Sequence, residues 1–274
     1  MTVYGFIGAG NMAGAIVEGL ISVTQASSVQ VFSAHGSAAA LAQRTGAVLA
    51  PSAPALVSAS DIVVLGVKPQ VVPAVLAELT LVLAQHSPLV VSIAAGLSTA
   101  RLEEWLPQGA RLVRAMPNMA AAVGQSMTAL CAGQNATDTD LQVAADLMAA
   151  VGRTLVLPEH LFSGFTALAG SSPAVVLTLI EALARGGVEA GLPKAQAVEV
   201  ATQAVLGTAQ MVQAEAAKTA RGEAGRSPAA LVDAVCSPAG TTVAGLIALE
   251  KAGFSPAVVA AVEATVARDR ELGA

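Results

Sequence analysis

Short apolar runs alternate with stretches of helical spacing along the first 157 residues of the chain. The run Asp61–Val67, which is apolar after its first residue, is typical of a strand buried on both faces of a parallel sheet. The runs predict strands at residues 3–7, 29–32, 46–49, 61–67, 89–93, 111–115, 126–131 and 154–157, with helices between them. Strands that alternate with helices in this way indicate a doubly wound α/β sheet.

The pattern changes after Pro158. No later run predicts a strand, and helices are predicted at residues 162–168, 174–190, 194–219, 228–235 and, as a final pair, 243–272. The helix at 174–190 is apolar on nearly all its faces, so in a small domain it must be covered by another subunit. We therefore expect two domains, residues 1–160 and residues 161–274. Residues 214–226 mix small and charged side chains and are a candidate mobile insertion.

The first strand leads into a turn of small residues and then into a helix, the order that a dinucleotide-binding unit needs. Gly8 permits the tight turn, Gly10 lets the backbone approach a pyrophosphate, and Ala13 is the small residue where helix packs on strand. The helix start offers free N–H groups to the phosphates. The competing interpretation is a turn without a ligand. The candidate residues are Gly8, Ala9, Gly10, Asn11, Met12 and Ala13.

Three later strand ends are further candidates for the cofactor site, because ligands of open α/β sheets lie beyond the carboxyl ends of the strands. The second strand ends without the acidic residue that would hold a ribose 2′-hydroxyl, so Ser33 and His35 favour NADP, unless this is an ordinary polar loop. Lys68 follows the fourth strand and is either a cofactor ligand or a surface charge. The other candidates are Gly66, Val67, Pro69, Gln70, Ala94, Ala95 and Gly96, and Asn118 lies in either the site or a turn.

A second candidate for chemistry is the run from Ser237 to Thr242 before a predicted helix. The N–H groups of Gly240, Thr241 and Thr242 could bind a carboxylate, and the two hydroxyls could donate to a substrate nitrogen or oxygen. Capping of the helix by either threonine is the competing interpretation, and taken alone it is the one we favour.

The composition limits the kinds of partner and the cellular location that we expect. The net charge is −5 and there are four lysines, so no basic patch points to nucleic acid. No apolar run reaches the roughly 18 residues of a membrane span, and the Met-Thr start leads straight into a strand, so we expect neither a membrane segment nor a signal peptide. Cys131 and Cys236 match no metal-ligand spacing. We expect no metal, two reduced thiols and a cytoplasmic location.

Taken together, these motifs resemble the 1-pyrroline-5-carboxylate reductase family from end to end of the chain. The matching segments are residues 5–13, 67–70, 92–96, 116–118, 166–174, 189–193 and 237–242. The resemblance implies an N-terminal Rossmann-type domain, a C-terminal all-helical dimerisation domain, and reduction of the cyclic imine to L-proline by NADPH or NADH, the last step of proline biosynthesis. It also implies a homodimer, with five dimers in a ring in many members.

The resemblance further implies roles for residues. The small-residue turn and the three strand ends would hold the cofactor, while Thr241 and Thr242 would hold the substrate, with Thr242 against the imine nitrogen. Glu159 falls where some members place a substrate-pocket carboxylate. The chain departs from the family pattern at five positions, two of which replace glycines: Ser172, Ala239, Val175, Ala53 and Ala234.

Three other functions compete with this one. A related cyclic imine could be the substrate. A hydroxyacid dehydrogenase would need a lysine base early in the second domain, but none occurs between Lys68 and Lys194. An NADP-binding regulator without activity would not need the Ser237–Thr242 turn. Because a cyclic imine is basic, a weak donor such as the Thr242 hydroxyl suffices for its nitrogen, which fits the lack of an evident His–Asp pair.

Overall fold

The computed structural model describes residues 1–273 and divides into two compact units. The first unit comprises residues 1–170 with the segment from Ala264 onward, and the second comprises Ser171–Glu263. Each is described by itself. The domain boundary that we expect after residue 160 remains a prediction, because these units are defined by backbone contacts and not by function.

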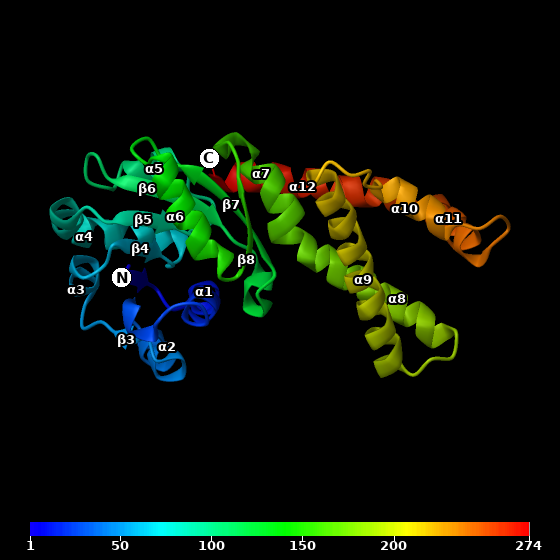
Figure 1. Ribbon diagram of the computed structural model, residues 1–274, viewed down its shortest axis with the longest axis horizontal. Coiled ribbons are helices and arrows are strands. Elements are labelled where there is room, and N and C mark those ends of the chain that lie inside the picture. The colour runs from blue at the N-terminus through cyan, green and yellow to red at the C-terminus, as the bar shows by residue number, and fades with distance from the viewer. Residues whose placement is uncertain (274) are drawn as a thin grey trace. The chain divides into compact units, whose positions relative to one another are not determined.

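The first unit is built on one eight-stranded sheet with the order β3-β2-β1-β4-β5-β6-β7-β8 (Figure 1). Strands β1 to β6 are parallel, β7 runs antiparallel to β6, and β8 is parallel to β7. The order of the first six strands is that of a dinucleotide-binding sheet, whose topological switch point lies between β1 and β4. The predicted doubly wound sheet is thus confirmed. The strands are β1 (Tyr4–Ile7), β2 (Val29–Phe32), β3 (Val48–Leu49), β4 (Ile62–Leu65), β5 (Leu89–Ser92), β6 (Arg111–Met116), β7 (Ser126–Ala132) and β8 (Gly152–Val156).

Helices cover both faces of the sheet because side chains alternate between the faces along each strand. Phe6 belongs to a core with α1, α2 and α6, while its neighbour Ile7 belongs to a second core with α3, α4 and α5. Strand β4 is buried at all four positions, as its apolar run predicts. The helices of this unit are α1 (Asn11–Ile21), α2 (Ser37–Thr45), α3 (Ala53–Ser58), α4 (Val72–His86), α5 (Thr99–Glu103), α6 (Asp138–Ala149) and α7 (Phe162–Phe165).

Short helical turns connect several of these elements. They are the 3₁₀ turns η1 (Ala26–Ser28), η2 (Pro69–Val71), η3 (Met119–Val123) and η4 (Glu159–Leu161), and the π-helical turn η5 (Thr166–Ser171). A smaller third core forms where Phe162 and Phe165 of α7 pack against Ala129 and Cys131 of β7. This core fixes the segment after β8 against the sheet.

The second unit is all-helical, as predicted. Its elements are α8 (Ser172–Glu189), α9 (Lys194–Ala220), α10 (Pro228–Val235), α11 (Thr241–Lys251) and the first part of α12 (Phe254–Gly273). Helices α8 and α9 pack against each other (Figure 1). Of the 18 residues of α8 only Ala184 is buried, and Val175, Val176 and Leu177 are exposed. Within the described chain this apolar helix is therefore largely uncovered.

The run Glu159–Glu189 is long and apolar enough to cross a membrane by length and composition, with a mean hydropathy of 1.6 and 17% of its window buried. The bent pair α11 and α12 passes the same test when taken as one span. A helix that is covered by a partner subunit has the same composition.

We expected a mobile insertion at residues 214–226, and the part of this segment as far as Ala220 is continuous with α9. Glu215 is buried, and its carboxylate accepts hydrogen bonds from the Arg226 backbone N–H (3.0 Å), the Arg226 guanidinium (3.0 Å) and the Lys218 ammonium (3.0 Å). The loop after α9 is therefore closed on a single buried carboxylate.

Candidate functional site

The turn after β1 has the backbone that a dinucleotide-binding loop requires. Gly8 has φ +102°, a conformation that residues with a Cβ rarely adopt. A Cβ at this position would lie 2.5 Å from the carbonyl oxygen of Gly66. The Gly8 N–H donates to the Phe32 carbonyl (2.8 Å), and the Gly66 N–H donates to the Ile7 carbonyl (2.8 Å), so the ends of β1, β2 and β4 converge on this turn.

The start of α1 is open to an anion. Gly10 is its N-cap and no side chain caps the helix, whose first turn carries no acidic residue. A Cβ on Gly10 would meet no atom within 4 Å, so space for a ligand lies beside it. Ala13 packs on Gly66, where a Cβ would come within 2.9 Å of the Ala13 methyl group. The free N–H groups and this space fit a pyrophosphate.

The end of β2 carries no acidic side chain in the structure. The Ser33 hydroxyl accepts hydrogen bonds from the Ala38 N–H (2.8 Å) and the Ser37 hydroxyl (3.0 Å), so it helps to begin α2. His35 is exposed. No carboxylate would repel a 2′-phosphate here, in agreement with NADP.

The segment after β4 leads from Gly66 to η2. Lys68 is exposed, and it makes no ion pair with any residue of the described chain. Pro69 begins the 3₁₀ turn. Lys68 is thus exposed and, among the described residues, unpaired at the carboxyl end of β4, which is compatible both with a cofactor ligand and with a surface charge.

Glu159 connects the segment after β8 to the turn after β5. Its Oε1 accepts from the Thr99 N–H (2.7 Å) and from Nη1 of Arg114 (2.8 Å), and its Oε2 accepts from the Thr99 hydroxyl (2.7 Å). Arg114 and Glu159 line a cavity of about 240 Å³, whose other lining residues are Gly96, Ser98, Phe162, Ser163, Asp269 and Arg270. A candidate cofactor residue and a candidate substrate residue therefore border the same cavity of the first unit.

The electrostatics of this cluster follow from its burial. Burial acts to raise the pKa of Glu159, but the hydrogen bonds from Arg114 and Thr99 outweigh it and hold the pKa below its usual value. Burial, together with the negative charge of Glu159, raises the pKa of Cys131 to about 12, although Arg114 acts in the opposite direction. Cys131 is therefore a protonated thiol and not a nucleophile.

The Ser237–Thr242 run belongs to the second unit, and helix α11 begins at Thr241, two residues earlier than predicted. Gly240 is its N-cap, and no side chain caps the helix, so the capping interpretation of the threonines is wrong. The Gly240 N–H, one of the predicted substrate donors, donates instead to the Ser237 carbonyl (3.0 Å). Within the described chain the N–H groups of Thr241, Thr242 and Val243 are the open donors of the first turn. Ala239 has φ +57° in this turn.

The structure thus brings the predicted cofactor residues together at the ends of β1, β2, β4 and β5, with Glu159 in the same unit, whereas Gly240, Thr241 and Thr242 lie in the second unit. Sequence reasoning missed Thr99 and Arg114. An arginine between Val113 and Ala115 in a buried strand was a usable signal, because a buried charge needs a partner.

Asn118 is turned toward the π-helical turn. Its side-chain N–H donates to the Ala169 carbonyl (2.8 Å), and its buried Oδ1 has no hydrogen-bond partner among the described residues. Its backbone N–H donates to the Ser126 hydroxyl (3.2 Å). The Asn118 side chain is thus bonded to a residue 51 positions away and not to its own turn, so these contacts support neither of its two interpretations.

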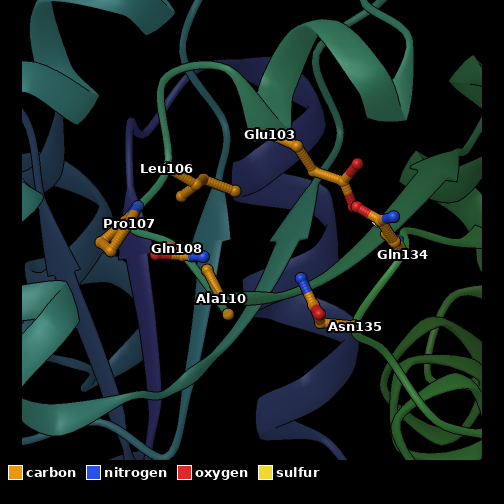
Figure 2. Close-up of a pocket in the computed structure, with 8 residues that line it drawn as sticks. Glu103, Leu106, Pro107, Gln108, Ala110, Gln134 and Asn135 are labelled. Atoms are coloured by element: carbon orange, nitrogen blue, oxygen red, sulfur yellow. Dashed lines mark hydrogen bonds between the residues drawn. The ribbon is translucent and has the colours of Figure 1, made fainter.

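Another hollow, of about 290 Å³, lies where β6 begins and β7 ends (Figure 2). Figure 2 shows Glu103 directed toward Gln134, and the Glu103 carboxylate accepts a hydrogen bond from the Gln134 backbone N–H. The dinucleotide turns follow the carboxyl ends of the parallel strands. This hollow lies at the amino end of β6 and is therefore at the opposite end of the strands. In the part of the chain that the structure describes, no group of three or more His, Cys, Asp or Glu side chains could hold a metal ion.

Comparison with known proteins agrees with this geometry. A family model described as pyrroline-5-carboxylate reductase dimerisation matches residues 159–272, and one described as NADP oxidoreductase, coenzyme F420-dependent, matches residues 3–96. The chain is 40% identical to a pyrroline-5-carboxylate reductase of Synechocystis sp. over 98% of this chain and 97% of that protein.

Two solved structures extend the likeness to the fold. A pyrroline-5-carboxylate reductase from Coxiella burnetii has a TM-score of 0.91 and 31% identity, and covers 100% of this chain and 99% of its own. The pyrroline carboxylate reductase of Plasmodium falciparum with NADP bound has a TM-score of 0.86 and 28% identity, covering 100% and 98%.

Proposed function

The chain belongs to the pyrroline-5-carboxylate reductase family, and we propose how its residues carry out the reduction of 1-pyrroline-5-carboxylate to L-proline with NAD(P)H. The observation that carries the function is the 40% identity over 98% of the chain to an enzyme of that name. The dinucleotide turn at Gly8 supports it independently, because its geometry comes from this chain alone.

We propose that the residues at the strand ends hold the cofactor. The N–H groups at the start of α1 bind the pyrophosphate, and Ser33 and His35 lie on the side of the adenosine ribose. The segment from Gly66 to Gln70 and the turn from Ala94 to Gly96 hold the nicotinamide half. A bound reduced nicotinamide supplies the hydride for the imine carbon.

The substrate is held by the first turn of α11. The N–H groups of Thr241 and Thr242 bind its carboxylate, supported by the open helix start. The Thr242 hydroxyl donates a hydrogen bond to the ring nitrogen. The proton that this nitrogen gains as the carbon receives the hydride comes from solvent water. Hydride transfer requires this turn and the nicotinamide site to meet, either within one chain or between two copies.

Glu159 is proposed as a residue of the substrate pocket on the strength of its position beside the cavity. Its two oxygens are already hydrogen-bonded to Thr99 and Arg114, which limits what they can offer to a substrate.

The chain assembles as a homo-oligomer, since the dimerisation model spans the helical unit. We propose a homodimer, with five dimers in a ring as the larger assembly, in the cytoplasm; the uncovered apolar side chains of α8 support the dimer.

The experiment that tests the function is a spectrophotometric assay. The protein is incubated with NADPH and 1-pyrroline-5-carboxylate, and in parallel with NADP and a small hydroxyacid. Loss of NADPH in the first reaction alone, with L-proline as the product, is expected. Formation of NADPH in the second reaction would instead identify a hydroxyacid dehydrogenase. Turnover in neither, with NADPH still bound, would identify a regulator.

A further inference from the structure

The turn after β5 is held at its far end by Thr99, and both polar groups of Thr99 are bound by one carboxylate, that of Glu159. The backbone N–H and the hydroxyl each donate to it at 2.7 Å. The two residues are 60 positions apart in the sequence, so the contact is not a by-product of local structure. It fixes where α5 begins and therefore where the turn from Ala94 to Ser98 ends.

The carboxylate is itself fixed by a buried cation. Arg114 is 9% exposed, donates to Glu159 at 2.8 Å, and lies over the ring of Phe162 with 4.5 Å between guanidinium carbon and ring centroid. Strand β6 carries Arg114 directly opposite Ser92, the last residue of β5. The chain of contacts therefore runs from the end of β5, through the guanidinium and the carboxylate, back to the turn that β5 enters.

Ala94 and Leu97 pack in the second core, but few other hydrogen bonds among the described residues hold the turn. Gly96 has φ +76° and a Cβ there would meet nothing within 4 Å, so the turn is open on one side. The Ser98 hydroxyl caps α5 by accepting from the Arg101 N–H (3.2 Å), and the Ala94 N–H donates to the Ser92 hydroxyl at 3.4 Å. The two short bonds to Glu159 are thus the strongest polar contacts of this segment.

We propose that Glu159 and Thr99 are positioning residues for hydride transfer: the Arg114–Glu159 pair holds Thr99, and Thr99 holds the Ala94–Gly96 turn at the height that the nicotinamide ring requires. This inference rests on the proposed function, in which that turn contacts the nicotinamide. It gives Glu159 a task for both of its oxygens that does not depend on contact with the substrate. A displacement of the ring by about 1 Å is enough to slow a reaction of this kind by roughly a hundredfold.

The first unit contains a matched control for this arrangement. The N–H and hydroxyl of Thr137 donate to Asp140 at 2.8 and 2.7 Å, and Asp140 is paired with Arg111 at 2.7 Å. Arg111 lies opposite Leu89 at the start of β5, at the other edge of the sheet. Removing either threonine hydroxyl breaks a hydrogen bond of the same kind and length, but only Thr99 is next to the proposed nicotinamide turn. Removal of the Thr137 hydroxyl also breaks the cap that it gives α6 by accepting from the Asp140 N–H (3.2 Å), so this control is the more disruptive substitution for stability.

The test compares Thr99→Val, Thr99→Ser and Thr137→Val with the wild-type protein. Three quantities are measured: the fluorescence of NADPH bound without substrate, kcat, and the deuterium isotope effect with NADPH labelled at the transferred position. Thr99→Val should lower kcat about tenfold, raise the isotope effect and change the fluorescence of the bound nicotinamide. Thr99→Ser should restore all three, and Thr137→Val should lower the melting temperature without changing them.

Three results would overturn the inference. The first is a Thr99→Val protein within twofold of wild type in kcat and isotope effect. The second is an equal loss of kcat in Thr99→Val and Thr137→Val. The third is a Glu159→Gln variant with a raised KM for the imine but unchanged isotope effect and nicotinamide fluorescence, because it would place Glu159 on the substrate. A wild-type protein that binds NADPH but does not reduce the imine would refute the proposed function instead, and the fluorescence comparison would still report on the turn.

Discussion

The carbonyl oxygen of Gly66 lies 2.5 Å from the point that a Cβ on Gly8 would occupy. The two residues follow β1 and β4, the strands between which the chain reverses its direction of winding, so the close approach occurs at the switch point of the sheet. The backbone at this crevice therefore has no room for a side chain on Gly8. The absence of that side chain lets a pyrophosphate approach the main chain.

Gly8→Ala should destabilise the protein by at least about 2 kcal/mol, because it adds both a positive-φ strain and a clash with Gly66. Its melting temperature should fall and its Kd for NADPH should rise. Gly10→Ala is the control, since its Cβ would meet no protein atom. It should cost less than about 1 kcal/mol of stability. It should still raise the Kd for NADPH, because the methyl group would project into the space that the ligand occupies. Equal melting temperatures for the two variants would contradict this.

Thr242→Ala should lower kcat/KM for the imine by roughly a hundredfold, the usual effect of removing one hydrogen-bond donor in the transition state. Thr242→Ser keeps the hydroxyl and should recover most of the loss. Steady-state kinetics with NADPH held in excess measures both. A loss below about threefold in the alanine variant would remove Thr242 from the mechanism.

Ala239→Gly should stabilise the second unit by up to about 1 kcal/mol. The alanine has φ +57° in the turn before α11, and glycine relieves that strain at some cost in unfolded-state entropy. Ser87, with φ +47° after α4, is the other described residue with a side chain in this conformation. Ser87→Gly should raise the melting temperature by a similar amount and leave the kinetics unchanged. A fall in melting temperature for Ala239→Gly would show that the methyl group makes contacts worth more than the strain.

Acid should loosen the second unit through Glu215. Its pKa is lowered to about 2 by the hydrogen bonds from the Arg226 backbone, from Lys218 and from the Arg226 side chain. Because the folded-state pKa lies below the unfolded value of about 4.3, the stabilisation is complete above that value and is lost as the pH falls toward 2.

Melting temperatures recorded between pH 5 and about 2 test this, using Glu215→Gln. The variant should be less stable than wild type at pH 5 and should lose less stability on acidification. Glu199→Gln, which changes an exposed carboxylate of the same helix, should follow the wild-type curve. Parallel curves for wild type and Glu215→Gln would contradict the prediction.

Leu177→Lys should dissociate the homo-oligomer. Leu177 is 58% exposed on α8, and a charge placed in a covered apolar interface is costly. Leu81→Lys, on α4 of the first unit and 85% exposed, is a matched substitution that should leave the mass in solution unchanged. Light scattering after gel filtration measures both. An unchanged mass for Leu177→Lys would place the interface elsewhere.

The strands and most helices could be predicted because their signals are local. Hydrophobic period and turn residues decided β1 to β6, and the all-round apolar character of residues 174–190 pointed to a partner subunit. The direction of β7 was not predictable from its own residues, because a short apolar run reads the same in either orientation. The π-helical turn at Thr166–Ser171 was likewise invisible, since it changes the hydrogen-bond pattern and not the composition.

The candidate site shows the same division. The residues at Gly8–Ala13 could be found because a glycine turn between strand and helix is a contiguous motif. The contact of Thr99 with Glu159 could not, because it joins positions 60 apart and depends on the arginine that β6 places between them. The start of α11 was predicted two residues late because the threonines were taken as caps, whereas Gly240 has that position.

The burial of Cys131 behind the Arg114–Glu159 pair has a consequence for how the protein withstands oxidants. A thiol with a pKa of about 12 is almost never a thiolate at neutral pH, and peroxides and disulfides react with the thiolate. The sulfur becomes open to attack when β7 separates from its neighbours. Protection of this thiol from oxidation is therefore a property of the folded state, and it is lost with the fold.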